Sequence, residues 1–240
     1  MEITIAELVR NGTISAEIGA TLWAAVDEQR SFLTVAIPRF AGKSTLSNAV
    51  LAVRPQKTPM HRFDGTPAML ERLRRERLGG YLVVAEFSQA PVPGYIWGEP
   101  VRRVFETLDE GYTLQASLHA GGVEQAVRVI AEENGVSDER ASAIDLVLYI
   151  ERFGEDEESF WRRLAHVYEI DGVRDGIPQG RTLFRWLANG DRFEAVEAPR
   201  GFAQDAADRE ARAAVLAELA SSGRTGVADV RQAVEAYRAG

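Results

Sequence analysis

The segment VAIPRFAGKSTL, residues 35–46, limits the possible folds of this chain more than any other part of it. A β-branched apolar run leads into a short loop, and Gly-Lys-Ser-Thr then opens an apolar helical pattern. A phosphate-binding loop requires this succession, because backbone N–H groups and the N-terminus of the helix attract an anion. We therefore predict a phosphate-binding loop with contacts from Ala41, Gly42, Lys43, Ser44 and Thr45.

Two side chains of this loop have specific expected roles. Lys43 would contact the β and γ phosphates of ATP, and the Ser44 hydroxyl would be the protein ligand of Mg²⁺. The full pattern GxxxxGK[ST] also has a glycine five residues before Gly42, where this chain has Ile37. A β-branched residue tolerates positive φ poorly, so the loop is expected to leave its strand along a different path. A helix cap that binds no ligand is the alternative interpretation.

Strands and helices alternate over the first two thirds of the chain. Apolar, β-branched runs predict buried strands at residues 32–37, 81–87, 112–120 and 143–153. Helical spacing predicts helices at residues 15–30 (with Ser15 as N-cap), 46–53, 67–78, 98–111 and 123–135. This alternation indicates right-handed βαβ crossovers and an α/β fold with a mainly parallel sheet.

The pattern changes at about residue 159. Two segments indicate short strands around turns at Asp171-Gly172 and Asn189-Gly190. From about Asp205 the chain is Ala-rich and charged, which predicts two helices separated by SSGRTG. We therefore expect a core at residues 1–158, with a helical lead-in at 1–30, and a C-terminal region of hairpins and helices at 159–240 that packs on the core.

Composition excludes several classes of function. The formal net charge of -8 argues against a general nucleic-acid binder, which normally carries a basic surface. The chain has no cysteine, and its three histidines lack metal-ligand spacing. The N-terminus is not a signal peptide, and no apolar run has the length of a membrane span. We expect a soluble cytoplasmic protein that reaches the inner membrane only through partners.

Two further residues follow predicted strands and could act on a bound nucleotide. Glu86 ends the run YLVVAEF, and an acid at the tip of such a strand stands near Mg²⁺ and the attacking water. His119 ends the next strand, where it could sense a γ-phosphate. The alternatives are an ordinary polar strand end for Glu86 and a structural hydrogen bond for His119. We take both as candidate catalytic residues.

The order of these motifs resembles the motor ATPases of bacterial secretion and type IV pilus systems. GTISAEIGATLWAAVDEQRSF before the loop, YLVVAEF, and GEPVRRVFETLDEGYTLQASLHA resemble successive parts of that motor domain. IDLVLYIERF and the hairpin segments resemble the parts that follow, so the likeness covers about residues 12–197. The residues that match the family's functional positions are Lys43, Ser44, Glu86 and His119.

The resemblance implies a RecA-like P-loop NTPase core with ATP and Mg²⁺ as cofactors. It also implies a homo-oligomeric ring and partners among inner-membrane platform proteins or other secretion and pilus proteins. Members of the family usually have a separate N-terminal domain, which we expect this chain to lack. The arginines of RLRRER, residues 72–77, could face phosphate across a subunit interface, or form a solvated helix face paired with acids.

Departures from the family leave two functions open. Ala85 stands where the family has glycine before the acid, Phe87-Ser88-Gln89 replaces Ile-Arg-Asp, and the acidic pair after the second strand is reduced to Asp64. The chain is accordingly either an ATP-hydrolysing motor subunit or a catalytically degenerate P-loop protein that serves as an interaction or regulatory module. An open loop at residues 36–44 would favour binding, whereas Ile37 or Phe40 filling the phosphate space would favour the second function.

Overall fold

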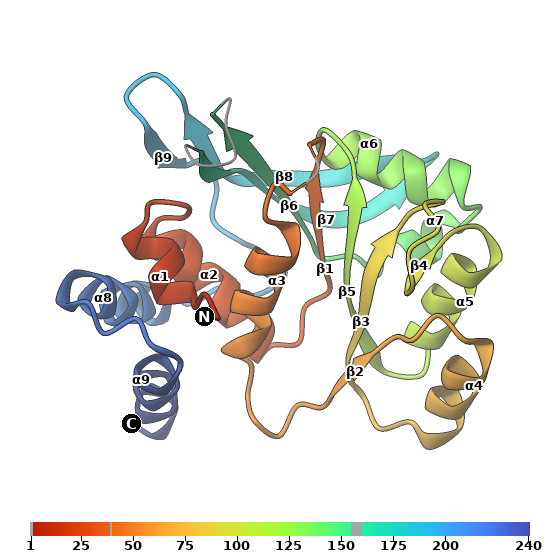
Figure 1. Cartoon of the computed structure of the whole chain (residues 1–240), viewed down its shortest axis with the longest axis horizontal. Helices are drawn as coiled ribbons and strands as arrows, with labels where there is room; N and C mark the ends of the chain where they lie inside the picture. Colours follow the sequence, from red (N-terminus) through yellow and green to blue (C-terminus); the bar gives the residue numbers. More distant parts are fainter. Residues whose placement is uncertain (1, 39, 155–159) are drawn as a thin grey trace.

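A sheet of nine strands organises the part of the chain that this computed structural model describes, residues 2–38, 40–154 and 160–240. Its strand order is β2-β3-β5-β1-β6-β7-β8-β9, and β4 pairs with β3 beside this path (Figure 1). Neighbours from β2 to β6 are parallel, and those from β6 to β9 are antiparallel. The strands are β1 (Phe32–Ala36), β2 (Met60–Arg62), β3 (Gly80–Phe87), β4 (Tyr95–Ile96), β5 (Tyr112–His119), β6 (Leu146–Phe153), β7 (Trp161–Arg174), β8 (Ile177–Leu187) and β9 (Arg192–Ala195).

Helices cover both faces of the sheet and enclose two hydrophobic cores (Figure 1). On one face lie α1 (Ile5–Arg10), α2 (Ala16–Asp27), α3 (Lys43–Ala52), α8 (Ala206–Ser222) and α9 (Val227–Ala239). On the other lie α4 (Pro67–Glu76), α5 (Glu99–Leu108), α6 (Val123–Arg128) with the π-helical turn Val129–Glu133, and α7 (Asp138–Ala141). The predicted α/β fold with a mainly parallel sheet is confirmed.

Alternating side chains along the strands explain why both faces are covered. Within β1, Phe32 packs in the core on the α2 and α3 side, whereas Leu33 packs in the core on the α5 side. All five residues of β1 are buried, as expected for a parallel strand between two helical layers. A continuous apolar run in the sequence therefore becomes a central strand.

Local capping signals fix where several helices begin. Ser15 caps α2 by accepting a hydrogen bond from the backbone N–H of Ile18 at 3.2 Å, as predicted. Thr66 caps α4 in the same way, with Pro67 in the first turn. The two C-terminal helices expected from the sequence are α8 and α9, and Gly223 ends α8 in the left-handed conformation.

The prediction for the first C-terminal hairpin is wrong in its turn and its strand lengths. β7 and β8 have 14 and 11 residues, and Asp175-Gly176 joins them, not Asp171-Gly172. Asp175 and Gly176 both have positive φ, which a two-residue hairpin turn of the right twist requires. Gly172 instead pairs with Gln179 within the hairpin, so the first Asp-Gly pair belongs to the strand. The second reversal, at Asn189-Gly190, is confirmed.

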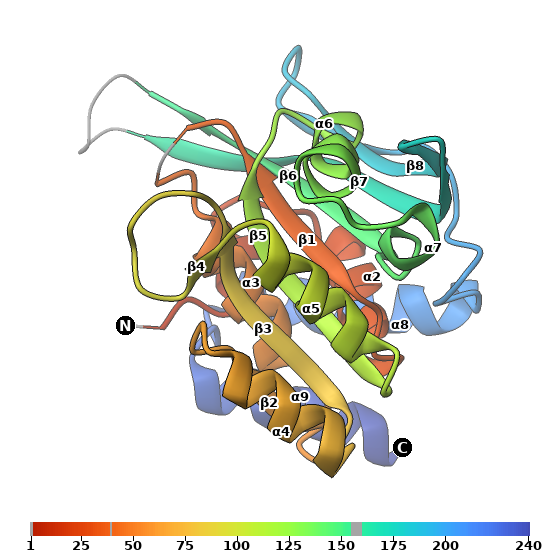
Figure 2. The ribbon, with the colours of Figure 1, turned by 90° about the vertical axis from the view of Figure 1, so that its right-hand side faces the viewer.

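The C-terminal strands extend the sheet of the core, because β7 pairs with β6. The boundary expected between residues 158 and 159 falls in a segment outside the described residues. After β9 the chain runs to the sheet face that carries α1, α2 and α3, where α8 packs on α1 and α2 (Figures 1 and 2). Across the described ranges, none of the helices has the length and apolar character needed to span a membrane.

Candidate functional site

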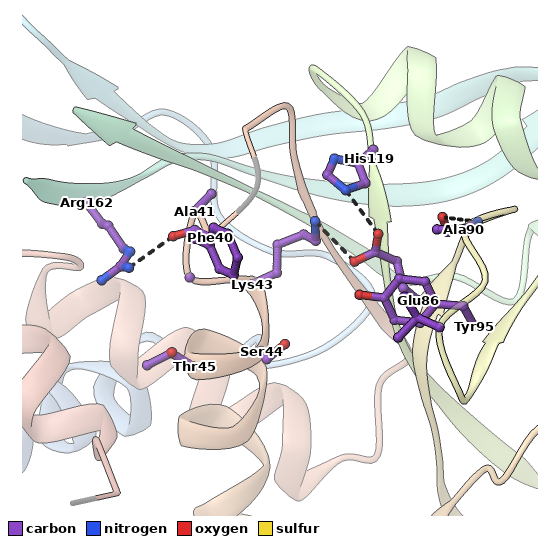
Figure 3. A pocket seen from close by; sticks show the side chains of 13 residues that line it. Phe40, Ala41, Lys43, Ser44, Thr45, Glu86, Ala90, Tyr95, His119 and Arg162 are labelled. Atoms are coloured by element: carbon purple, nitrogen blue, oxygen red, sulfur yellow. Dashed lines mark hydrogen bonds and ion pairs between the residues drawn. The ribbon is translucent and has the colours of Figure 1, made fainter. Parts of the chain in front are cut away.

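A pocket of about 520 Å³ opens where β1, β3 and β5 end and α3 begins (Figure 3). Ligands of open parallel sheets bind at this edge, beyond the carboxyl ends of the strands. The seven residues predicted for the nucleotide site all line the pocket: Ala41, Gly42, Lys43, Ser44, Thr45, Glu86 and His119. The remaining lining residues are Phe40, Ser88, Ala90, Val92, Tyr95 and Arg162.

The N-terminus of α3 faces the pocket without a capping side chain. Gly42 is the N-cap, with φ 100° and ψ 14°, and no side chain accepts a hydrogen bond there. The first-turn N–H groups of an α-helix have no partner within the helix, and Lys43, Ser44 and Thr45 occupy that turn. Together with the helix dipole, these N–H groups make the end of α3 attractive to an anion.

The loop before α3 leaves both of its large apolar side chains exposed. Ile37 is 55% exposed and does not line the pocket, whereas Phe40 is 80% exposed and does line it. Phe40 has φ 58°, whereas Ile37 keeps a negative φ. Among the described residues of the loop, Phe40 and Gly42 have positive φ. Residue 39 lies outside the described residues.

The strand order brings Glu86 and His119 to the loop. β5 lies between β1 and β3, and its last residue, His119, pairs in register with Ala36 of β1. On the far side of β5, the pairing with β3 shifts by one residue between Val84 and Phe87. The side chains of Val84 and Phe87 both pack in the core on the α5 side, although the two residues are three positions apart. A regular strand would place them on opposite faces, so the β-bulge turns Glu86 toward α3 and the pocket.

Glu86 holds two other side chains of the pocket together (Figure 3). Its Oε2 lies 3.3 Å from the Lys43 Nζ, and its Oε1 lies 3.1 Å from the His119 Nε2. The side chains of Lys43 and Glu86 are 9% and 8% exposed, and that of His119 is 38% exposed. Lys43 is thus paired with a nearly buried acid rather than free in solvent.

His119 links Glu86 to the start of the loop. Its Nδ1 lies 3.1 Å from the Ile37 carbonyl oxygen, which can only accept, so Nδ1 carries the hydrogen of that bond. The Nε2 on the other side of the ring faces the Glu86 carboxylate, so the imidazole bridges that acid and the loop backbone.

Arg162 is the pocket residue that the sequence analysis missed. It comes from β7, and its Nη2 donates a hydrogen bond to the Phe40 carbonyl oxygen at 3.0 Å. Ser88, Ala90, Val92 and Tyr95 also line the pocket, although the sequence analysis gave none of them a role there. The first three follow β3, and Tyr95 begins β4. No motif marks Arg162, because only the pairing of β7 with β6 brings this position to the loop.

Two other sequence features lie outside the pocket. Asp64 Oδ1 accepts hydrogen bonds from the Thr66 hydroxyl and N–H at 2.7 and 2.8 Å, which lowers the pKa of Asp64. Asp64 is thus part of the turn before α4. Three arginines of RLRRER form ion pairs on the surface of α4: Arg72 with Glu76, Arg74 with Glu106 and Arg77 with Glu110.

Comparison with known proteins gives remote relatives. No protein-family model matches the sequence. The chain is 26% identical over 213 residues to the uncharacterized protein MJ1287 of Methanocaldococcus jannaschii, a match that covers 78% of this chain and 77% of that protein.

Three solved structures are similar to this one. The VirB11 ATPase of the Brucella suis type IV secretion system, in complex with sulphate, is 15% identical with a TM-score of 0.47, over 64% of this chain and 52% of that one. The ATPase DotB of Legionella pneumophila is 11% identical with a TM-score of 0.44, over 88% and 54%. DotB of Yersinia pseudotuberculosis is 12% identical with a TM-score of 0.45, over 90% and 53%. The chain spans about half the length of each.

Proposed function

We propose that this chain binds ATP with Mg²⁺ at the N-terminus of α3 and uses Glu86 to hydrolyse it. One observation carries the proposal: the helix end has no capping side chain, and Lys43 and Glu86 converge beside it from separate elements. A lysine and an acid at the carboxyl edge of parallel strands, next to an anion-binding helix end, suit phosphoryl chemistry.

The residues present fit a magnesium–phosphate group. The first-turn N–H groups and Lys43 would hold the phosphates, while the Ser44 hydroxyl would bind the metal. Magnesium usually keeps several waters and takes few protein ligands besides phosphate oxygens. Such a site does not need a cluster of acids, and none of three or more metal-ligating side chains occurs among the residues described.

Glu86 would act on the water that attacks the terminal phosphate. A bound phosphate competes with Glu86 for Lys43, since both are anions, and frees an oxygen of the carboxylate. His119 would keep the other oxygen oriented and carry the change to the Ile37 carbonyl at the start of the loop. A change in nucleotide binding at α3 would in this way alter the contacts of His119 at the end of β5 and of Ile37 after β1.

At the level of biology, we place the chain as a motor-type subunit of a bacterial secretion or type IV pilus assembly. The support is the order of motifs over residues 12–197. Such a subunit would work as a homo-oligomeric ring in the cytoplasm, attached through inner-membrane platform proteins. A second candidate is a P-loop module that no longer hydrolyses ATP and serves in interaction or regulation. Ile37 at the loop entry, Ala85 and Phe87-Ser88-Gln89 favour it.

The test is phosphate release from Mg-ATP by the wild type, Glu86→Gln and the exposed-surface control Glu133→Gln. Loss of a general base typically costs about 10²-fold or more in turnover. We expect Glu86→Gln to lose turnover by about that factor and still bind ATP, with Glu133→Gln unchanged. Turnover that survives Glu86→Gln would remove Glu86 from the mechanism. ATP binding without turnover in the wild type would select the second candidate.

A further inference from the structure

Arg162 packs against the backbone of the phosphate-binding loop at two points. Its Nη2 donates to the Phe40 carbonyl oxygen at 3.0 Å. Its Cδ and Nε would lie only 2.7 and 2.8 Å from a Cβ atom built on Gly42. The aliphatic part of the Arg162 side chain therefore occupies the space that any side chain at position 42 would need. Through Arg162, β7 packs against the start of α3.

Neighbouring groups hold the guanidinium in place. Arg152 and Arg162 both lie over the Phe160 ring, with Cζ atoms 4.7 and 4.4 Å from its centroid. Burial, and then the positive charge of Arg152, lower the pKa of Arg162. An anion that entered the pocket would offset both effects, so the electrostatic setting of Arg162 favours a negatively charged ligand.

The pocket has two ends, and Arg162 lies at the end away from the acid (Figure 3). Lys43 Nζ, Glu86 and His119 meet at one end, where attack on a terminal phosphate would occur. Arg162 and Thr45 lie toward the other end. A nucleotide whose terminal phosphate sits beside Lys43 therefore directs its α-phosphate, the one next to the sugar, toward Arg162.

We propose that Arg162 binds the α-phosphate of the nucleotide, as a binding residue supplied by this chain's own β7 strand. This inference rests on the proposed function. An arginine has five N–H donors in a planar fork that matches a phosphate, and the Phe40 carbonyl accepts from Nη2. Since ADP and ATP share the α-phosphate, Arg162 contributes equally to binding both and takes no part in hydrolysis.

The experiment measures ADP and Mg-ATP affinity by calorimetry for the wild type, Arg162→Gln, Arg162→Met and the control Arg185→Gln. Arg185 lies on the adjacent strand β8, is ion-paired with Glu194 and is not a pocket residue. A charge-assisted hydrogen bond contributes about 1.5–3 kcal/mol, which corresponds to roughly tenfold or more in affinity. We expect both Arg162 variants to weaken ADP and ATP by that factor alike, and Arg185→Gln to match the wild type.

Each other result separates this inference from the function on which it rests. A wild type that binds neither nucleotide overturns the proposed function and this inference with it. A wild type that binds, with Arg162 variants of equal affinity, overturns only the role of Arg162. A selective loss of ATP affinity would place Arg162 at the terminal phosphate and contradict the assignment. Arg162→Met keeps the aliphatic stem against Gly42, so it tests the charge even where Arg162→Gln fails to fold.

Discussion

Lys43 and Glu86 form an ion pair in a part of the pocket that excludes most solvent. A nearly buried charge is costly to leave without a partner, which makes the pair mutually dependent. Under the proposed function, a phosphate at Lys43 would compete with the carboxylate for its charge, while His119 stays at the other carboxylate oxygen. Ligand binding and the release of Glu86 would then be coupled.

Gly42 gives a prediction at the scale of a single residue. Alanine there would be strained at φ 100° and would also meet the Arg162 stem at 2.7 Å. Gly190, at φ 92° with open space around it, is the matched control for strain alone. We expect Gly190→Ala to lower the free energy of unfolding by about 1–2 kcal/mol, and Gly42→Ala by clearly more. Urea denaturation measures both, and equal losses would contradict the packing of Arg162 on the loop.

The site residues differ in how much of their position can be predicted from the sequence. Lys43 and Ser44 follow from the strand, loop and helix pattern, because neighbours in the chain fix them. Glu86 and His119 follow from strand ends, although their mutual contact depends on β5 lying between β1 and β3. Arg162 could not be predicted, since its place in the pocket depends on the register of β6 with β7.

At the scale of elements, the bulge in β3 decides which face of the sheet Glu86 occupies, and the composition of the strand does not. The run YLVVAEF predicts a buried strand but not which face Glu86 occupies. Period-two alternation from Val84 would place Glu86 on the α5 side, within an apolar core. The extra residue in the pairing between Val84 and Phe87 reverses this. Single-sequence patterns carry no signal for a bulge of this kind.

The turn between β7 and β8 is a second feature that local sequence patterns do not determine. The sequence offers Asp-Gly at both 171–172 and 175–176, and local turn preference does not distinguish them. Tertiary contacts decide: Asp171 pairs with Arg181 at 2.5 Å, and Gly176 N–H donates to Asp138 at 3.1 Å. The presence of a hairpin was therefore predictable, and its register was not.

His166 of β7 gives a pH prediction for this hairpin. Its Nε2 contacts the Thr182 hydroxyl of β8 at 2.8 Å, and burial lowers the pKa of His166, against the raising effect of Glu124. The unfolded chain, with an ordinary histidine pKa of about 6.5, then binds more protons than the folded one just below that pH. Stability should fall as pH drops through this range and level off below the folded-state pKa. Urea denaturation above and below about pH 6.5 should show that the free energy of unfolding of His166→Gln changes less with pH than that of the wild type. An equal change in the two proteins would contradict a lowered pKa for His166.

At the scale of the whole molecule, the two ends of the chain pack together away from the pocket (Figure 1). Arg212 of α8 lies against the rings of Trp23 and Tyr237, with its Cζ 4.7 and 5.2 Å from their centroids, and the two rings contact each other. Its Nη1 also lies 2.6 Å from Asp27 at the end of α2. The C-terminal helices thus complete the core on the α3 side of the sheet, and Arg238 of α9 donates to the Val53 carbonyl at the end of α3.

The central claim is that the end of α3 binds ATP through Lys43. The measurement that tests it most directly is Mg-ATP binding by calorimetry on the wild type, Lys43→Ala and Lys57→Ala, with folding of each checked by circular dichroism. Lys57 is the other lysine of the chain and is exposed on the surface, so it controls for loss of charge. We predict that Lys43→Ala weakens binding by roughly tenfold or more while Lys57→Ala binds like the wild type. Equal affinity in Lys43→Ala, or a folded wild type that does not bind ATP, would contradict the claim.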